Sequence, residues 1–249
     1  MKRLLVCLLC VSALALPLNA LACTATGFVR DGINMTAAVI NPGNVAGTVT
    51  TPTVVDATGC NIGVYFSTSG SIQYVDIYGA NYFGVVVNGD GSLINVDVKD
   101  STIHNIGETP FNGSQHGVAI YYRAYGGVGT GVTGDIDGNA ISLYQKGGIV
   151  VNGPNAWVNT LGNTVTGLGE VDFIAQNGIQ YWGSNGTIRG NTISDNFYTG
   201  TVGVGPNPGG QNPPGWEYIA GGLLLYQTGL VKHSKNFYAN NQRNVEMVQ

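Results

Sequence analysis

The sequence predicts an all-β, single-domain solenoid in which short parallel strands stack coil upon coil. Glycine accounts for 39 of the 249 residues, whereas only 10% of the residues are charged. The glycines lack the every-third spacing that collagen requires, and two short motifs recur in a fixed order along the chain. Because 43% of the residues are hydrophobic, a core can form, and an all-β chain with many tight turns fits this composition best.

The first 22 residues have the pattern of a secretory signal peptide. Lys2 and Arg3 precede a long apolar run, which ends in Ala20-Leu21-Ala22, the small-x-small pattern that signal peptidase reads. The alternative is a lipoprotein signal with acylation of Cys23, but the residues before Cys23 form a poor lipobox. We therefore expect a secreted or periplasmic protein, with lipid anchoring at Cys23 as the less favoured alternative.

Two cysteines remain once the signal is removed, Cys23 and Cys60. An even pair in an exported chain favours one disulfide, which would tie the N-terminal segment to the first regular part of the fold. We divide the chain into a signal peptide (1–22), a cap segment (23–58), a parallel solenoid domain (59–241) and a C-terminal tail (242–249). The segment 24–58 lacks the repeat, and we expect it to cover the open edge of the first coil.

The charge balance excludes some partners. The formal net charge is −4 at pH 7, and signal removal makes it more negative, because it takes two basic residues and no acidic one. This balance does not attract nucleic acid. No later apolar run approaches the length that spans a bilayer. We expect a monomer with no nucleic-acid partner and no membrane span.

Each repeat starts with a glycine followed by aliphatic residues. These starts lie at Gly63, Gly84, Gly117, Gly148, Gly178 and Gly222. A bend motif follows, as DGNAI, LGNTV, RGNTI and the degraded SKNFY, with KDSTI as a serine variant. Equivalent strands of neighbouring coils lie about 4.8 Å apart, so we expect the bend residues Asn139, Asn163, Asn191 and Asn236 to stack as a hydrogen-bonded ladder. The glycine before Asn139, Asn163 and Asn191 relieves the crowded backbone there.

Alternation after each repeat glycine predicts two inward columns of side chains. The first column would hold Val64, Val85, Val118, Ile149, Ile179 and Leu223, and the second Phe66, Val87, Ile120, Val151, Tyr181 and Leu225. The residues after the asparagine bend would complete the core with Ile103, Ile141, Val165 and Ile193.

The repeat resembles that of the right-handed parallel β-helix proteins of the pectate-lyase-like superfold, and specifically the exported bacterial β-helix repeat proteins. The resemblance covers roughly residues 55–241 and is carried by the GI/GV starts and the GNTI bends. It implies a right-handed parallel β-helix of about six to seven coils. Members of the superfold include pectate lyases, polygalacturonases and other polysaccharide-processing enzymes, many of which use a loop-flanked groove along one sheet.

Three long segments fall at the same turn of the coil, before Gly117, Gly178 and Gly222, and we expect them to wall a cleft. On the face beside them, one outward column would hold Asn88, Tyr121, Asn152, Trp182 and Tyr226, and another Val86, Ala119, Val150, Gln180 and Leu224, with Arg123 just beyond. Aromatic rings and amides together suit sugars, although the aromatics could simply pack beneath the loops. The predicted binding residues for a polysaccharide or cell-surface glycan are Tyr121, Arg123, Asn152, Gln180, Trp182 and Tyr226.

An acidic column is expected on the following sheet. The segments YVDIY, NVDVK and GDIDG align Asp76, Asp97 and Asp135, and stacked carboxylates repel unless they splay apart, share a proton or share a cation. Calcium is the natural candidate cation, with Asp137 as a further ligand, and a solvated acidic edge is the alternative. The histidines show no metal-ligand spacing, and His116 is interpreted as a turn residue.

Catalytic signals are weak. Glycosidases need two carboxylates at a defined separation, and the candidates on the cleft side are Glu108, Glu170, Asp172, Asp195 and Glu217. A lyase would use a basic residue, for which Arg123 is the candidate on the cleft strand. Neither the Asp-Asp pair typical of polygalacturonases nor the Arg-rich motif typical of pectate lyases is present. The sequence thus predicts a polysaccharide-binding solenoid; if enzymatic, it would be a polysaccharide lyase or glycoside hydrolase. The alternative is a non-enzymatic structural or adhesive surface solenoid.

Overall fold

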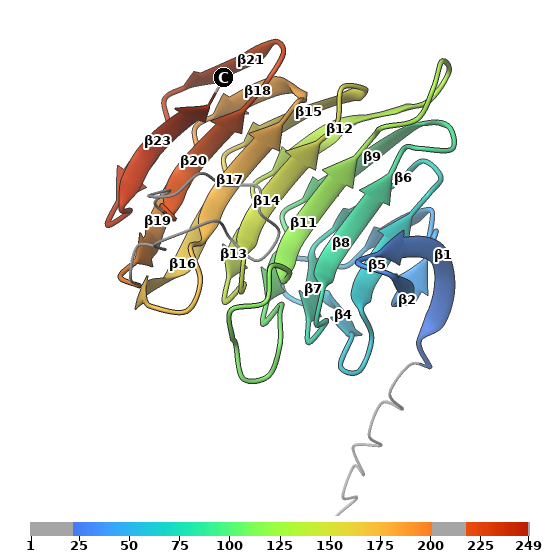
Figure 1. Cartoon of the computed structure of the whole chain (residues 1–249). Helices are drawn as coiled ribbons and strands as arrows, with labels where there is room; N and C mark the ends of the chain where they lie inside the picture. The colour runs from blue at the N-terminus through green and yellow to red at the C-terminus, as the bar shows by residue number, and fades with distance from the viewer. Residues whose placement is uncertain (1–21, 201–217, 249) are drawn as a thin grey trace, which may run out of the picture.

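The computed structural model describes residues 22–200 and 218–248. In this part of the chain every helix or strand element is a β-strand, and the strands form three long sheets that run side by side (Figure 1). From β5 (Ile62–Phe66) onward the chain visits the three sheets in the same order before it returns to the first one. This arrangement is consistent with a β-solenoid.

Sheet A has nine strands, and all of its neighbours pair in parallel except the first two. In spatial order it contains β1 (Thr24–Arg30), β2 (Ile33–Ile40), β5, β8 (Phe83–Asn88), β11 (Val118–Arg123), β14 (Gly147–Asn152), β17 (Asn177–Trp182), β20 (Gly221–Tyr226) and β23 (Arg243–Val248).

Sheets B and C have seven parallel strands each. Sheet B contains β3 (Asn44–Ala46), β6 (Gly70–Gln73), β9 (Leu93–Lys99), β12 (Gly131–Asp137), β15 (Ala156–Leu161), β18 (Asn185–Arg189) and β21 (Val231–Ser234). Sheet C contains β4 (Thr53–Asp56), β7 (Val75–Tyr78), β10 (Thr102–His104), β13 (Ala140–Ser142), β16 (Thr164–Val171), β19 (Thr192–Tyr198) and β22 (Phe237–Ala239).

The core lies between the three sheets and consists of side-chain columns, as the periodicity predicts. In sheet C the predicted residues Ile103, Ile141, Val165 and Ile193 are neighbours in register and are buried. In sheet A the columns contain Val64 with Val85 and Ile149 with Ile179, and these residues are buried too. Stacked aliphatic side chains thus supply the apolar burial that stabilises each coil.

The predicted register of β11 is wrong by two residues. Ile120 pairs with Val85 and Ile149, and Tyr122 pairs with Val87 and Val151. Val118, which was expected in the inward column, instead lies beside Phe83 on the outer face of the sheet. The cause is that Ala119, rather than Gly117, occupies the position that glycine has in the other coils.

The repeat glycine stands where the chain turns into sheet A and its Cα faces the core. A Cβ atom built at Gly63 would lie 2.6 Å from Ile77, and one built at Gly84 would lie 2.6 Å from Ile103. Such contacts are closer than van der Waals packing allows, so most coils need glycine at this position.

The asparagine ladder is confirmed. The Nδ2 group of Asn139 donates to Oδ1 of Asn163 (2.9 Å), Asn163 donates likewise to Asn191 (2.9 Å), and Asn191 to Asn236 (2.9 Å). The backbone N–H of Ser101 donates to Oδ1 of Asn139 at 3.0 Å, so the serine variant ends the ladder. These amides are buried or partly buried, and each bond satisfies polar groups that would otherwise destabilise the bend.

The N-terminal segment contains more than a cap. Strands β2, β3 and β4 extend sheets A, B and C, so the stacked part of the fold already begins at Ile33. Among the described strands, only β1, which pairs antiparallel with β2, departs from the parallel pattern. The predicted disulfide is confirmed, because Cys23 and Cys60 are bonded, and it fixes the start of β1 to the segment before β5. The predicted signal peptide lies outside the described residues except for Ala22.

Strand β1 curls over the outer face of sheet A. Three strands, β2, β5 and β8, separate β1 from β11 in the sheet, yet the Phe28 ring lies 5.0 Å from the Arg123 guanidinium on β11. The Phe28 ring also lies near Tyr65 and Phe83, with centroids 6.2 and 6.4 Å away. Neighbouring strands are about 4.8 Å apart, so these contacts require that β1 leave the plane of the sheet. At the other end, the segment expected as a tail forms β23, which pairs with β20.

Candidate functional site

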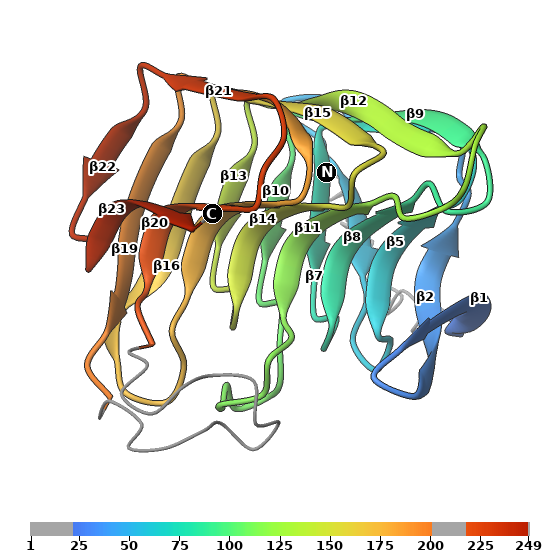
Figure 2. The ribbon, with the colours of Figure 1, turned by 45° about the horizontal axis from the view of Figure 1, so that its top comes forward.

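The three long connections fall at the same turn of the coil. They join sheet C to sheet A before β11, β17 and β20, as the sequence predicts, and the first two protrude together in Figure 2. The third connection lies largely outside the described residues. Loops gathered on a rigid scaffold are frequent carriers of function.

The connection before β11 is held in place by hydrogen bonds. The buried side chain of Gln145 accepts from the backbone N–H groups of Glu108 (3.1 Å) and Asn112 (3.2 Å) and donates to the carbonyl of Ser114 (2.7 Å). His116 was interpreted as a turn residue, and its ring stacks on Tyr82 at 3.8 Å and bonds through Nε2 to Glu108 at 2.6 Å. This connection is therefore a preorganised wall.

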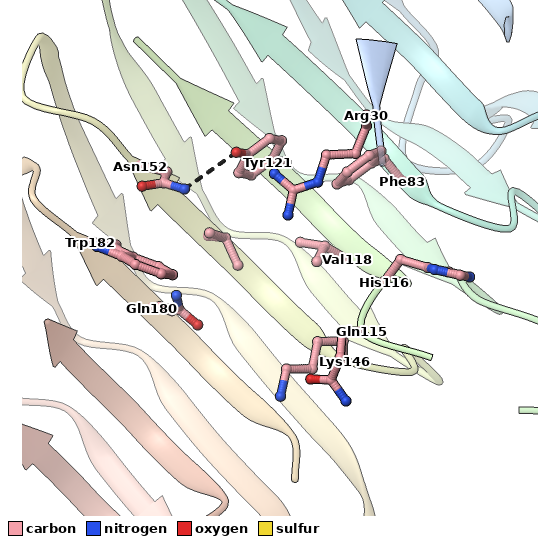
Figure 3. A pocket seen from close by; sticks show the side chains of 11 residues that line it. Arg30, Phe83, Gln115, His116, Val118, Tyr121, Lys146, Asn152, Gln180 and Trp182 are labelled. Carbon is pink, nitrogen blue, oxygen red and sulfur yellow. Dashed lines mark hydrogen bonds between the residues drawn. The ribbon is translucent and has the colours of Figure 1, made fainter. Parts of the chain in front are cut away.

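A pocket of about 220 Å³ lies beside this wall, on the outer face of sheet A. We call it the sheet A pocket, and it is shown in Figure 3. Its floor includes the apolar residues Phe83, Val118 and Val150. Four of the six predicted binding residues line it, namely Tyr121, Asn152, Gln180 and Trp182.

Trp182 is the most open aromatic of the pocket. Its side chain comes from the end of β17, it is 44% exposed, and Figure 3 shows its indole directed toward the pocket. The Tyr226 ring packs against it edge-on at 4.9 Å. Tyr226, also a predicted binding residue, is not among the residues that line the pocket, and it supports Trp182 from the next strand. The exposed part of the indole is available to contact a ligand.

Tyr121 is buried and does not share a column with Trp182. It pairs with Val86 and Val150, while Arg123 occupies the column of Asn88, Asn152 and Trp182. The Tyr121 ring is only 4% exposed, stacks on Phe83 at 5.1 Å, and its hydroxyl accepts from Asn152 Nδ2 at 3.3 Å. Tyr121 therefore behaves as a packed aromatic, which was the alternative to sugar binding, although it still contributes to the pocket lining.

Arg123 is occupied by structural contacts. Its guanidinium forms an ion pair with Asp90 at 2.8 Å and lies over the Phe28 ring at 5.0 Å. It does not line the sheet A pocket. Its contact with Phe28 holds β1 against the outer face of the sheet. Arg123, the predicted lyase base, thus contacts Asp90 and Phe28 instead of the pocket.

Sequence reasoning missed the polar residues that reach the pocket from the edge strand β1 and from the turns between strands. They are Arg30 at the end of β1, Gln115 and His116 in the connection before β11, and Lys146 in the turn before β14. Lys146 donates from Nζ to the carbonyl of Ala175 at 2.7 Å, and burial lowers its pKa to about 8. No repeat position marks these residues, because turns and the cap do not follow the coil period.

The predicted acidic column does not form as expected. Asp97 and Asp135 are neighbours in sheet B, but Asp76 lies on sheet C, where its carboxylate is 3.0 Å from Nε2 of His104. The correction has a simple cause: YVDIY and NVDVK look alike, but β7 and β9 belong to different sheets.

A lysine takes the place expected for calcium. The Lys99 ammonium lies 3.0 Å from Asp97 and 3.6 Å from Asp135, and its hydrogen bond to Asp97 raises its pKa. Within residues 22–200 and 218–248, no group of three or more His, Cys, Asp or Glu side chains is arranged to hold a metal ion. Lys99 relieves the repulsion that the stacked carboxylates would otherwise cause.

The candidate catalytic carboxylates are dispersed. Glu108 bonds to His116, while Glu170 and Asp195 line a separate open pocket with Phe197 and Asn240. Glu217 lies outside the described residues. None of the described residues that line the sheet A pocket is acidic, so the two-carboxylate arrangement of a glycosidase is not found there.

No known protein family, curated protein or solved structure matches this chain. Among the residues described, there is no helix of the length and apolarity needed to cross a membrane. The disulfide fits an oxidising compartment outside the cytosol.

Proposed function

We propose that this protein is an exported solenoid that binds a polysaccharide or cell-surface glycan in the sheet A pocket. The observation that carries the proposal is the exposed indole of Trp182, held edge-on by Tyr226 beside the amides of Gln180 and Asn152. Sugar rings present apolar C–H faces and hydroxyl groups, which an aromatic face and neighbouring amides complement.

Binding without cleavage is the favoured activity. The described residues lining the pocket include no carboxylate, and Arg123 is paired with Asp90. A glycoside hydrolase would need two carboxylates at the scissile bond. A polysaccharide lyase would need a base in contact with the sugar, and this remains the enzymatic alternative.

The finer fold is also part of the proposal. We infer right-handed winding, because a strand that returns to a parallel neighbour in the same sheet almost always crosses over with that hand. With about six to seven coils, such a chain resembles the pectate-lyase-like superfold through its GI/GV starts and GNTI bends. We place the mature protein outside the cytosol, secreted or periplasmic, as a monomer.

A panel of immobilised polysaccharides tests this function. Purified mature protein should be retarded by at least one member of the panel, and reducing-sugar and unsaturated-product assays on the same panel should detect no product. Product formation would replace the binder by a hydrolase or a lyase, according to which product appears. A protein that is retarded by no glycan, but adheres to whole cells or to other proteins, would support a structural or adhesive solenoid instead.

A further inference from the structure

The charged side chains that line the sheet A pocket are basic, while the carboxylates of Asp31, beside Arg30, and Glu108, bonded to His116, are not among the lining residues. The described lining residues include Arg30 and Lys146, together with His116, but no aspartate or glutamate. The whole chain has a formal net charge of −4 at pH 7. Two basic groups at one pocket in an acidic protein indicate a local site for negative charge.

The two basic groups come from different parts of the fold. Arg30 ends the cap strand β1, whereas Lys146 lies in the turn before β14, four strands further along sheet A than β2. Figure 3 shows Arg30 above the sheet near Tyr121 and Phe83, and Lys146 on the other side of Val118, next to Gln115. A ligand that lies across Val118 would therefore meet a cation at either side.

The cap position of Arg30 is fixed by several contacts. The disulfide holds the start of β1, Phe28 packs between Tyr65 and Phe83, and the Phe28 ring lies under the Arg123 guanidinium. The Arg30 side chain is 43% exposed, and its Nε faces Asp31 at 3.3 Å. The terminal guanidinium nitrogens are thus left to reach a ligand, as in bidentate recognition of carboxylates.

Lys146 is held from the opposite side. Its Nζ donates one hydrogen bond, to the Ala175 carbonyl, and an ammonium has two further donors. The side chain is only partly exposed. A desolvated ammonium gains more from a bound anion than a surface lysine does.

We propose that the cap strand completes the pocket by supplying Arg30, and that Arg30 and Lys146 together bind the acidic substituent of a charged glycan. This inference rests on the proposed glycan-binding function, in which Trp182 stacks on a sugar ring. The shared chemistry is a carboxylate or a sulfate ester on the sugar. Either anion accepts charge-assisted hydrogen bonds from both cations.

The test compares glycans that differ only in charge. We would measure the affinity of the mature protein for a polyuronate and for the same polymer after methyl esterification, and for a sulfated glucan and its unsulfated parent. The acidic member of at least one pair should bind about tenfold more tightly or better. This preference should weaken as salt is added, because salt screens partly exposed charges. The pair that shows it identifies carboxylate or sulfate.

Variants locate the preference in the pocket. Arg30→Gln and Lys146→Gln should each remove most of it, whereas Arg189→Gln, at the exposed end of β18 in sheet B, should leave it unchanged. Arg189→Gln lowers the net charge by the same amount, so it controls for long-range attraction. If Lys146→Gln does not fold, Arg30→Gln carries the test, because Arg30 lies at an exposed strand end.

The outcomes separate this inference from the proposed function. Equal binding of acidic and neutral polymers, still dependent on Trp182, would overturn the acidic site and leave the glycan-binding function standing. A preference that persists in Arg30→Gln, or that Arg189→Gln reduces equally, would also overturn it. Failure to bind any glycan would refute the function itself, and the inference with it.

Discussion

The outer face of sheet A has two halves: β1 covers one of them, and the other is open to solvent. Over β5 and β8, β1 lies on the sheet, and Tyr65, Phe83 and Phe28 are each less than 8% exposed. Over β17 and β20, Trp182 is 44% exposed. Both halves carry aromatics at outward positions of equivalent strands. The comparison shows that alternation along a strand determines which way a side chain points. Whether an outward aromatic side chain is buried or stays open to a ligand depends instead on whether β1 covers it.

A charge in the inward column should have the largest effect. Ile179 is fully buried, and its neighbour Gln180 points to the pocket. Ile179→Asp should abolish folding or cost at least about 4 kcal/mol of unfolding free energy, because the carboxylate has no partner in the core. Gln180→Asp, one residue away, should cost less than about 1 kcal/mol. Urea unfolding followed by circular dichroism measures both, and similar losses would contradict the alternation.

Truncating Phe28 on β1 should have the second-largest effect on stability, and it tests the half of sheet A that β1 covers. Phe28→Ala should lower the unfolding free energy by about 3 kcal/mol, because the ring packs on Tyr65, Phe83 and Arg123. Trp182→Ala should lower it by less, about 1 to 2 kcal/mol, since 44% of Trp182 is open to solvent and this part loses no burial. Thermal and urea unfolding of both variants give the comparison. If Trp182→Ala were the more destabilising change, the open half would be a packed surface.

The sequence predicts the interior better than the outer face. The columns through Val64 and Val165, the asparagine ladder and the Cys23–Cys60 bond all follow from a regular period or a residue count. The repeat pattern predicts the wrong register for β11. Ala119 stands at the position of the repeat glycine, so a prediction that takes Gly117 as this glycine is wrong by two residues. A local motif match cannot detect this replacement.

The candidate site depends on segments outside the period. Arg30 reaches the pocket only because β1 curls over the sheet, and Lys146 only because a turn places it there. Both positions follow from tertiary contacts of Phe28 and Ala175, which no strand pattern encodes. The same limit explains Asp76, whose strand resembles that of Asp97 but belongs to another sheet.

Lys146 should make a smaller contribution, which appears as a change of the unfolding free energy with pH. Burial lowers its pKa from 10.5 to about 8. Above pH 8 the unfolded chain therefore binds a proton at this lysine that the folded chain does not, so this residue makes unfolding less favourable as the pH rises from 8 toward 10. The gain should be about 1 kcal/mol, because the side chain keeps some contact with solvent.

Lys146→Met serves as the reference for this effect. The difference in unfolding free energy between wild type and Lys146→Met should shift in favour of wild type between pH 8 and pH 10. Arg30 stays charged over this range, and His116 is common to both proteins, so the difference isolates the lysine. A difference that is independent of pH would show that Lys146 keeps an ordinary pKa and is well solvated.

The central claim is that the open half of sheet A binds glycan through Trp182, and one pair of affinities tests it most directly. Trp182→Ala should weaken binding to a retained polysaccharide by about 1 to 3 kcal/mol. Trp157→Ala is the matched control, because Trp157 is 50% exposed and lies on sheet B; it should leave the affinity unchanged. Equal affinities for wild type and a folded Trp182→Ala, or equal losses in the two variants, would contradict the account.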